Sequence, residues 1–206
     1  MKNKIFVGEF IGSALLVMAI VGSGIMAESL TNDTAVILLA NAVATGAALY
    51  FLIVSISDIS GAHFNPFVTL AMYLSKKIKS QLLPVYFTAQ ILGCLTGVML
   101  ANFFFDYSLI ELSSKSRSGI NVFVSEIIAT FGLIFIIFRT IKGGKVLVAT
   151  SVATFITAGY WFTSSTSFAN PAVAIARTFT NTFTGINYLN TPVSYTHLRA
   201  HETSID

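Results

Sequence analysis

Two Asn-Pro pairs, Asn65-Pro66 and Asn170-Pro171, carry the most distinctive polar chemistry of this 206-residue chain. Each pair begins a short apolar segment, and proline suits the first position of a helix. An asparagine at such a start offers amide N–H donors and an acceptor, next to backbone N–H groups that have no helical partner. A helix N-terminus also carries about half a positive charge. The pairs therefore predict sites that bind neutral hydroxylic solutes and repel cations.

The elements that hold these pairs are predicted to be membrane helices. Hydrophobic residues make up 54% of the chain and charged residues 10%, against roughly 25% charged residues in soluble domains. A bilayer core needs about 20 apolar residues per helix. Five stretches meet this need: Ile5–Ala27, Ala35–Ser57, Leu82–Phe105, Val122–Ile141 and Val146–Ser164.

Two shorter apolar segments, Pro66–Leu74 and Pro171–Phe179, follow the second and fifth stretches. Each is long enough to reach only about halfway across a bilayer. We predict an all-α membrane protein with two re-entrant half-helices. The formal net charge of +3 is too small to suggest nucleic acid, and the sequence has no basic patch with interleaved aromatics, so no nucleic-acid interface is expected.

The chain also repeats itself. Glu9 in the first stretch and Glu126 in the fourth stand in similar sequence, and each lies upstream of one Asn-Pro pair. Three spans separate the two glutamates, an odd number, so the second copy should be inverted. The repeats are about residues 1–105 and 122–187. Inverted repeats with interrupted segments point to a substrate site near the bilayer midplane, where opposed helix N-termini would interrupt a proton wire.

Basic residues predict the orientation. Cationic clusters lie before the first stretch and in alternate loops, which predicts a cytoplasmic N-terminus. The clusters are Lys2 and Lys4; Lys76, Lys77 and Lys79; and Arg139, Lys142 and Lys145.

Over about residues 1–187 the chain resembles the aquaporin, or major intrinsic protein, family. The resemblance rests on Ser60-Gly61-Ala62-His63-Phe64-Asn65-Pro66, on Asn170-Pro171-Ala172 and on the two glutamates. It implies a pore centre formed by both Asn-Pro motifs and Ala172, an inverted-repeat fold and a homotetramer.

The resemblance also implies structural roles for Glu9 and Glu126, as acceptors for the irregular backbone before each half-helix. Charge within a membrane span is costly, so these carboxylates require a role. A proton relay is the alternative to the structural one. His63 is expected to brace its loop and not to bind a metal.

The selectivity filter of water-selective members has an aromatic residue, a histidine, a loop residue and an arginine. Counting from the motifs places these positions at Thr45, at Ala158 or Gly159, at Ser167 and at Val173. All are small or uncharged, so we predict a wide filter without a fixed cation.

This pattern resembles a bacterial aquaglyceroporin-like subgroup linked to arsenic resistance. It suggests glycerol-sized neutral solutes, including neutral arsenic species, in a bacterial inner membrane. A water-selective pore is the rival interpretation.

Two residues depart from the family pattern. Arg177 lies one turn beyond Val173 on the same helix face, where it either replaces the missing filter cation from the vestibule or snorkels at the interface. Phe67 stands where the family usually has alanine, and it either narrows the pore centre or packs against a neighbouring helix.

Residues 188–206 are polar and resemble sequencing-adapter read-through, with a disordered tail as the alternative. We therefore expect the sixth span of the family to be missing, and the chain as written to fold poorly or to conduct weakly.

Other function classes are less consistent with the residues. A secondary transporter also uses inverted repeats, but no ion-coupling site is visible. The sequence shows neither a Ser/His/Asp constellation nor metal-ligand spacing, so no enzyme activity, catalytic residue, metal or cofactor is expected. The expected partners are the lipid bilayer and small neutral solutes.

Overall fold

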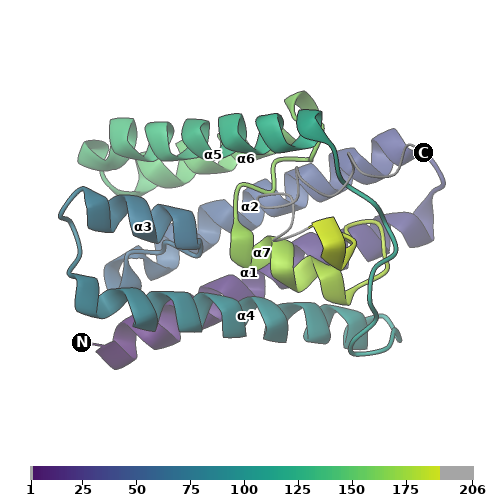
Figure 1. Ribbon diagram of the computed structural model, residues 1–206, viewed down its shortest axis with the longest axis horizontal. Coiled ribbons are helices and arrows are strands. Elements are labelled where there is room, and N and C mark those ends of the chain that lie inside the picture. Colours follow the sequence, from purple (N-terminus) through teal and green to yellow (C-terminus); the bar gives the residue numbers. More distant parts are fainter. Residues whose placement is uncertain (1, 191–206) are drawn as a thin grey trace, which may run out of the picture.

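The computed structural model describes residues 2–190, and these are helical with connecting loops and no strand (Figure 1). The long helices are α1 (Lys2–Leu30), α2 (Thr34–Ser60), α4 (Leu83–Phe104), α5 (Ile120–Thr140) and α6 (Lys145–Phe162). The short ones are α3 (Pro66–Leu74) and α7 (Pro171–Ala176). Four 3₁₀ turns complete the described part: η1 (Ser80–Leu82), η2 (Ile141–Gly143), η3 (Arg177–Phe179) and η4 (Tyr188–Asn190).

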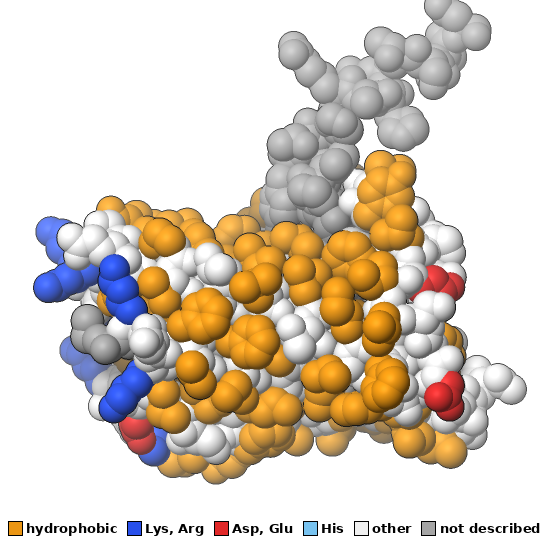
Figure 2. All heavy atoms as spheres, turned by 90° about the horizontal axis from the view of Figure 1, so that it is seen from below, with side chains coloured by type: hydrophobic (Ala, Val, Ile, Leu, Met, Phe, Trp, Pro, Cys, Tyr) orange, Lys and Arg blue, Asp and Glu red, His pale blue; other side chains and the backbone are white. Residues whose placement is uncertain are grey.

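Five of these segments are long and apolar enough to cross a membrane, judged by length and composition. They coincide with the five predicted stretches, so the all-α membrane class is confirmed. Figure 2 shows a broad hydrophobic band with Lys and Arg gathered at one end of the molecule, where one acidic side chain also lies, and with further Asp and Glu side chains at the other end. Of the predicted non-native tail, residues 188–190 form η4, and residues 191–206 lie outside the described residues.

The first repeat is tightly packed because glycines let two helices approach closely. A Cβ atom added at Gly93 of α4 would lie 2.4 Å from the Phe10 carbonyl oxygen of α1. One added at Gly97 would lie 2.3 Å from the Ala14 carbonyl oxygen. Small residues at helix interfaces serve this purpose in membrane proteins, where van der Waals packing drives association.

The two half-helices lie nearly end to end, between α4 and the α5–α6 pair (Figure 1). α3 has the bounds that the sequence predicted, Pro66–Leu74. The second predicted half-helix is α-helical only over Pro171–Ala176, and it ends in the 3₁₀ turn η3. Each half-helix has proline in its first turn and asparagine as its N-cap, as the local sequence requires.

The linker between α4 and α5, residues 105–119, holds the segment that follows α7. Ser113 N–H donates to the Thr178 carbonyl (2.9 Å), and Asn187 N–H donates to the Lys115 carbonyl (2.8 Å). The linker thus connects the two repeats in sequence and also fastens the end of the second repeat in space. This fastening places linker side chains beside the loop that leads into α7.

Candidate functional site

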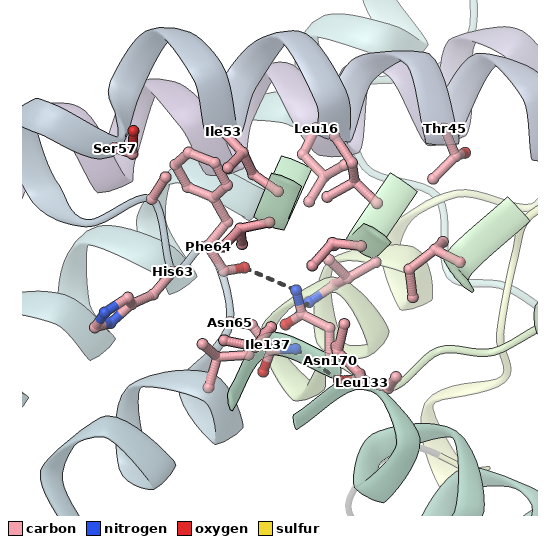
Figure 3. A pocket seen from close by; sticks show the side chains of 18 of the residues that line it. Leu16, Thr45, Ile53, Ser57, His63, Phe64, Asn65, Leu133, Ile137 and Asn170 are labelled. Atoms are coloured by element: carbon pink, nitrogen blue, oxygen red, sulfur yellow. Dashed lines mark hydrogen bonds between the residues drawn. The ribbon is translucent and has the colours of Figure 1, made fainter. Parts of the chain in front are cut away.

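The two Asn-Pro asparagines meet at the centre of the molecule through reciprocal hydrogen bonds. Asn65 Nδ2 donates to the Ala169 carbonyl (2.6 Å), and Asn170 Nδ2 donates to the Phe64 carbonyl (2.7 Å). Figure 3 shows the second of these bonds, with Asn65 and Asn170 close together. Each amide therefore ties its own half-helix to the loop of the other repeat.

The amide oxygens of the same asparagines cap their own helices. Asn65 Oδ1 accepts from Phe67 N–H (2.8 Å), while Asn170 Oδ1 accepts from Ala172 N–H (3.2 Å) and Val173 N–H (3.4 Å). An amide nitrogen carries two hydrogens, and these bonds use one on each residue. One N–H hydrogen per asparagine is left to donate to a solute.

Glu9 holds the loop that leads into α3. Its Oε1 accepts from Ser60 Oγ (2.6 Å) and His63 N–H (3.0 Å), and its Oε2 accepts from Phe64 N–H (2.7 Å) and Gln90 Nε2 (2.8 Å). The side chain is fully buried. All four contacts are donors to Glu9, which is the arrangement that suits an ionised carboxylate.

Glu126 holds the loop before α7 in the same way. Its Oε1 accepts from Ser165 Oγ and Phe168 N–H (3.0 Å), and its Oε2 accepts from Ala169 N–H (2.7 Å). Each carboxylate thus takes one serine hydroxyl and two successive backbone N–H groups. The inverted repeat extends to individual hydrogen bonds.

The backbone of both loops adopts an unusual conformation at matching positions. In the first loop Ala62 and Phe64 have φ values of 52° and 49°, and in the second Ser167 and Ala169 have values of 52° and 41°. Non-glycine residues rarely adopt this left-handed region, and such strain persists only where the surroundings enforce it. The glutamate hydrogen bonds supply that enforcement, and residues of both loops line the central cavity.

This cavity has a volume of about 280 Å³ and runs past both asparagines. Apolar side chains from α2, α5 and α6 form much of its wall, including Ile53, Leu133 and Val152. At one end of the cavity the residues lining it include Asp58 and Lys145, which form an ion pair. Toward the other end it meets Arg177.

Among the predicted filter residues, Thr45, Ser167 and Val173 line the cavity, but Ala158 and Gly159 do not. The placement of Ala158 in the filter was wrong, because its position on α6 is exposed on the outer face. Gly159 lies behind the filter, where an added Cβ would come within 2.8 Å of Ser167 Oγ.

The cavity face of α6 carries Ile156 and Tyr160 instead, one helical turn apart. Counting from the Asn-Pro motif missed Tyr160 because the count ignored the rotation of α6 about its own axis. Its hydroxyl lies 3.1 Å from Thr45 Oγ1. Ser167 Oγ is buried with no hydrogen-bond partner in the described part of the chain. The three hydroxyl-bearing residues Thr45, Tyr160 and Ser167 line this part of the cavity.

Arg177 is buried, with 3% of the residue exposed, so it does not snorkel at an interface. Its Nε donates to the Thr184 carbonyl, and its guanidinium lies 4.7 Å from the centre of the Phe168 ring. It is one of the residues that line the cavity. The structure therefore has a cation close to the predicted filter, one turn away from Val173.

His63 and Phe67 behave differently from each other. His63 Nδ1 lies 3.1 Å from Thr69 Oγ1, and its ring stacks on Tyr86 with centroids 4.6 Å apart. These contacts brace the loop, and no cluster of metal-ligating side chains occurs among residues 2–190. Phe67 is half-buried and does not line the cavity, so it does not narrow the centre.

Comparisons with known proteins point to one family. Residues 2–194 match the family described as Major intrinsic protein, a match that runs past the predicted boundary at Asn187. The chain is 48% identical over 180 residues to Aquaglyceroporin AqpS of Rhizobium meliloti (strain 1021), covering 87% of this chain and 77% of that protein. It is 34% identical over 148 residues to Probable aquaporin TIP2-2 of Oryza sativa subsp. japonica, covering 69% of this chain and 58% of the relative.

A solved structure shares the fold. The aquaglyceroporin from Plasmodium falciparum superposes with a TM-score of 0.70 at 21% sequence identity, covering 86% of this chain and 78% of that one. The chain spans 58% and 43% of the two plant relatives from Oryza sativa and Arabidopsis thaliana, the latter named Aquaporin NIP3-1.

Proposed function

The chain belongs to the major intrinsic protein family, and from that premise we propose that it is a passive transmembrane channel for small uncharged solutes, with water and glycerol as its solutes. The relative with 48% identity is named an aquaglyceroporin. The observation that carries the proposal is the pair of asparagines that face each other across a cavity built by both repeats.

Exclusion of cations and protons follows from this arrangement. The N-termini of the two half-helices present partial positive charge at the centre of the cavity. The free amide hydrogens of Asn65 and Asn170 orient a solute oxygen toward themselves, which breaks a continuous proton wire. The apolar wall offers nothing to replace the hydration shell of an ion. A neutral solute can exchange hydrogen bonds with the amides and the loop carbonyls as it passes.

Passage of a polyol is supported by the residues at the filter end. Val173 leaves that position without a long side chain, while Ser167 and the hydroxyl-bonded pair Thr45 and Tyr160 also line the cavity. Adjacent hydroxyl donors and acceptors match the closely spaced hydroxyls of glycerol. Arg177 lies at the same end and adds a fixed positive charge that disfavours cations. Neutral arsenic species of glycerol size are also consistent with this filter.

The test is a stopped-flow assay on proteoliposomes that contain the 206-residue chain. A hyperosmotic shock with an impermeant sugar measures water flux, and a glycerol gradient measures glycerol entry. We expect both rates to exceed those of empty liposomes. Glycerol entry at the rate of empty liposomes would leave only a water-selective pore. Saturable uptake that depends on an ion gradient would favour a secondary transporter, and no flux of either solute would mean that the chain as written does not conduct.

The type of membrane and the orientation of the chain are proposed from the charge distribution and from the similarity to relatives. The chain is a multi-pass membrane protein, and a bacterial plasma membrane with a cytoplasmic N-terminus fits its charge distribution. The clustered Lys and Arg at one end of the molecule support this orientation (Figure 2). A single cysteine placed at Lys2 or at Ser114 and labelled from outside intact cells would test it, because Cys94 is buried. A homotetramer is proposed from the family, and mass photometry of the purified protein would test it.

A further inference from the structure

Two arginines, Arg177 and Arg117, bring positive charge to one end of the cavity. Arg177 is 3% exposed and lines the cavity. Among residues 2–190, its guanidinium donates one hydrogen bond, from Nε to the Thr184 carbonyl. Its two terminal nitrogens carry four more N–H donors, which point to a ligand that can accept them.

A second arginine reinforces this charge from the linker between the repeats. Arg117 lies with its guanidinium 5.9 Å from the centre of the Phe168 ring, the same ring that Arg177 contacts. Its Nη2 donates to the Phe183 carbonyl (3.0 Å) and its Nε to the Gly185 carbonyl (3.3 Å). These bonds to neutral carbonyls fix Arg117 in place and do not cancel its charge.

Among residues 2–190, neither arginine has a carboxylate within ion-pair distance. The ion pairs within the described residues are Lys115–Glu28 and Lys145–Asp58. Glu126 attracts Arg177 through space, but both of its oxygens already accept hydrogen bonds from the loop before α7. A buried charge without a partner is costly. The cost falls if an anion occupies the space beside Arg177.

We propose that the Arg177 end of the cavity binds a small oxyanion, which occupies the cavity and blocks solute passage. An oxyanion offers paired oxygens, which match the parallel N–H groups of a guanidinium. Arg117, whose guanidinium lies near the same Phe168 ring, strengthens binding by adding positive potential. The bound anion does not cross, because the cavity wall past the asparagines is largely apolar, with Ile137 and Val148 among its residues, and does not replace the hydration shell of the anion.

Sulfate is a suitable probe, since it is impermeant and keeps its charge near neutral pH. Glycerol entry into proteoliposomes is measured with sulfate on both membrane faces, and compared with chloride at equal ionic strength and osmolarity. We expect sulfate to reduce the wild-type rate at least twofold. In Arg177→Gln, the ratio of the glycerol entry rate in sulfate to that in chloride should be one. In Arg117→Gln, the same inhibition should need several-fold more sulfate. Each variant serves as its own reference, so a change in its basal rate cancels.

Lys115→Gln is the matched control. Lys115 is a cation on the same linker, but its charge is already paired with Glu28 at 3.5 Å. This variant should respond to sulfate as the wild type does. A wild-type rate that is equal in sulfate and chloride would overturn the proposal, and so would equal inhibition of wild type and Arg177→Gln.

A melting experiment in detergent tests the same site without measuring transport. Failure of the anion-site proposal is therefore distinguishable from failure of the channel function. Ligand binding to the folded state raises stability in proportion to the logarithm of ligand concentration. Sulfate also stabilises proteins non-specifically, and this background is the shift seen in Arg177→Gln. We expect a larger sulfate-induced rise in Tm for wild type and Lys115→Gln than for Arg177→Gln. Equal rises in all three would refute the anion site.

Discussion

Replacement of Glu9 by glutamine tests whether the glutamates hold the loops, since it keeps the shape of the side chain and removes its charge. Whichever way the new amide is oriented, its NH₂ group faces a backbone N–H, that of His63 or that of Phe64. A buried donor left without a partner costs about 1–3 kcal/mol, and the remaining hydrogen bonds lose their charge assistance, at about 1 kcal/mol each. We expect Glu9→Gln to lower the free energy of unfolding by about 2–5 kcal/mol.

The consequence for transport follows from what the loop holds. Phe64 N–H binds Glu9, and the Phe64 carbonyl accepts the hydrogen bond from Asn170. If the loop relaxes at Phe64, it therefore moves the carbonyl group to which Asn170, the N-cap of α7, donates. Stability is measured by thermal melting in detergent, and transport by glycerol and water entry into proteoliposomes. We expect both fluxes to fall together.

Glu126→Gln is the matched variant in the other repeat, and it should have a similar effect through Phe168 and Ala169. Proton entry is measured in the same vesicles with a trapped pH dye. A wild-type melting temperature and wild-type fluxes in Glu9→Gln would refute the loop-holding argument. A proton conductance that is present in wild type and lost in both variants would instead support a proton relay.

Three further predictions concern the cavity wall and its packing. Tyr160→Phe removes the hydroxyl that lies 3.1 Å from Thr45 Oγ1. Glycerol entry should slow by about 2- to 12-fold, which is equivalent to one hydrogen bond of about 0.5–1.5 kcal/mol, while water flux should change less. Equal slowing of both solutes would contradict a role of this hydroxyl in polyol recognition. Val173→Arg places a long cation at a position that lines the cavity, and should abolish most glycerol entry while preserving water flux, as stopped-flow traces would show. Gly12→Ala brings a Cβ within 1.9 Å of the Phe64 ring, and overpacking of this kind costs about 1–3 kcal/mol; an unchanged melting temperature would show that the ring moves aside freely.

Much of the fold could be predicted from the sequence because membrane helices depend on local composition. Continuous apolar runs defined the five spans, and proline after asparagine marked the start of each short helix. The bounds of α3 were predicted to the residue, since both its cap and its length are local properties. The end of α7 was less predictable, because its last turn tightens to 3₁₀ geometry where the linker pairs with residues 178 and 179.

The cavity wall was predicted only in part. Thr45, Ser167 and Val173 line it, but Ala158 and Gly159 do not, and Tyr160, which lines it, was not among the predicted residues. Counting along a helix gives depth to about one residue, while the face depends on rotation by about 100° per residue. A one-residue error in a count therefore changes the face that a residue presents.

The sequence by itself determined that the chain crosses a membrane, that it carries two inverted copies of one design, and that each copy ends in an asparagine-capped half-helix. These properties follow from continuous apolar runs, from the positions of short motifs along the chain and from local helix caps. The tertiary structure decided what those asparagines contact, because Asn65 bonds to Ala169 and Asn170 to Phe64 across more than 100 positions of sequence. It also decided that Arg177 is buried with Arg117 beside the same aromatic ring. Such partners depend on how the repeats pack, which no local pattern specifies.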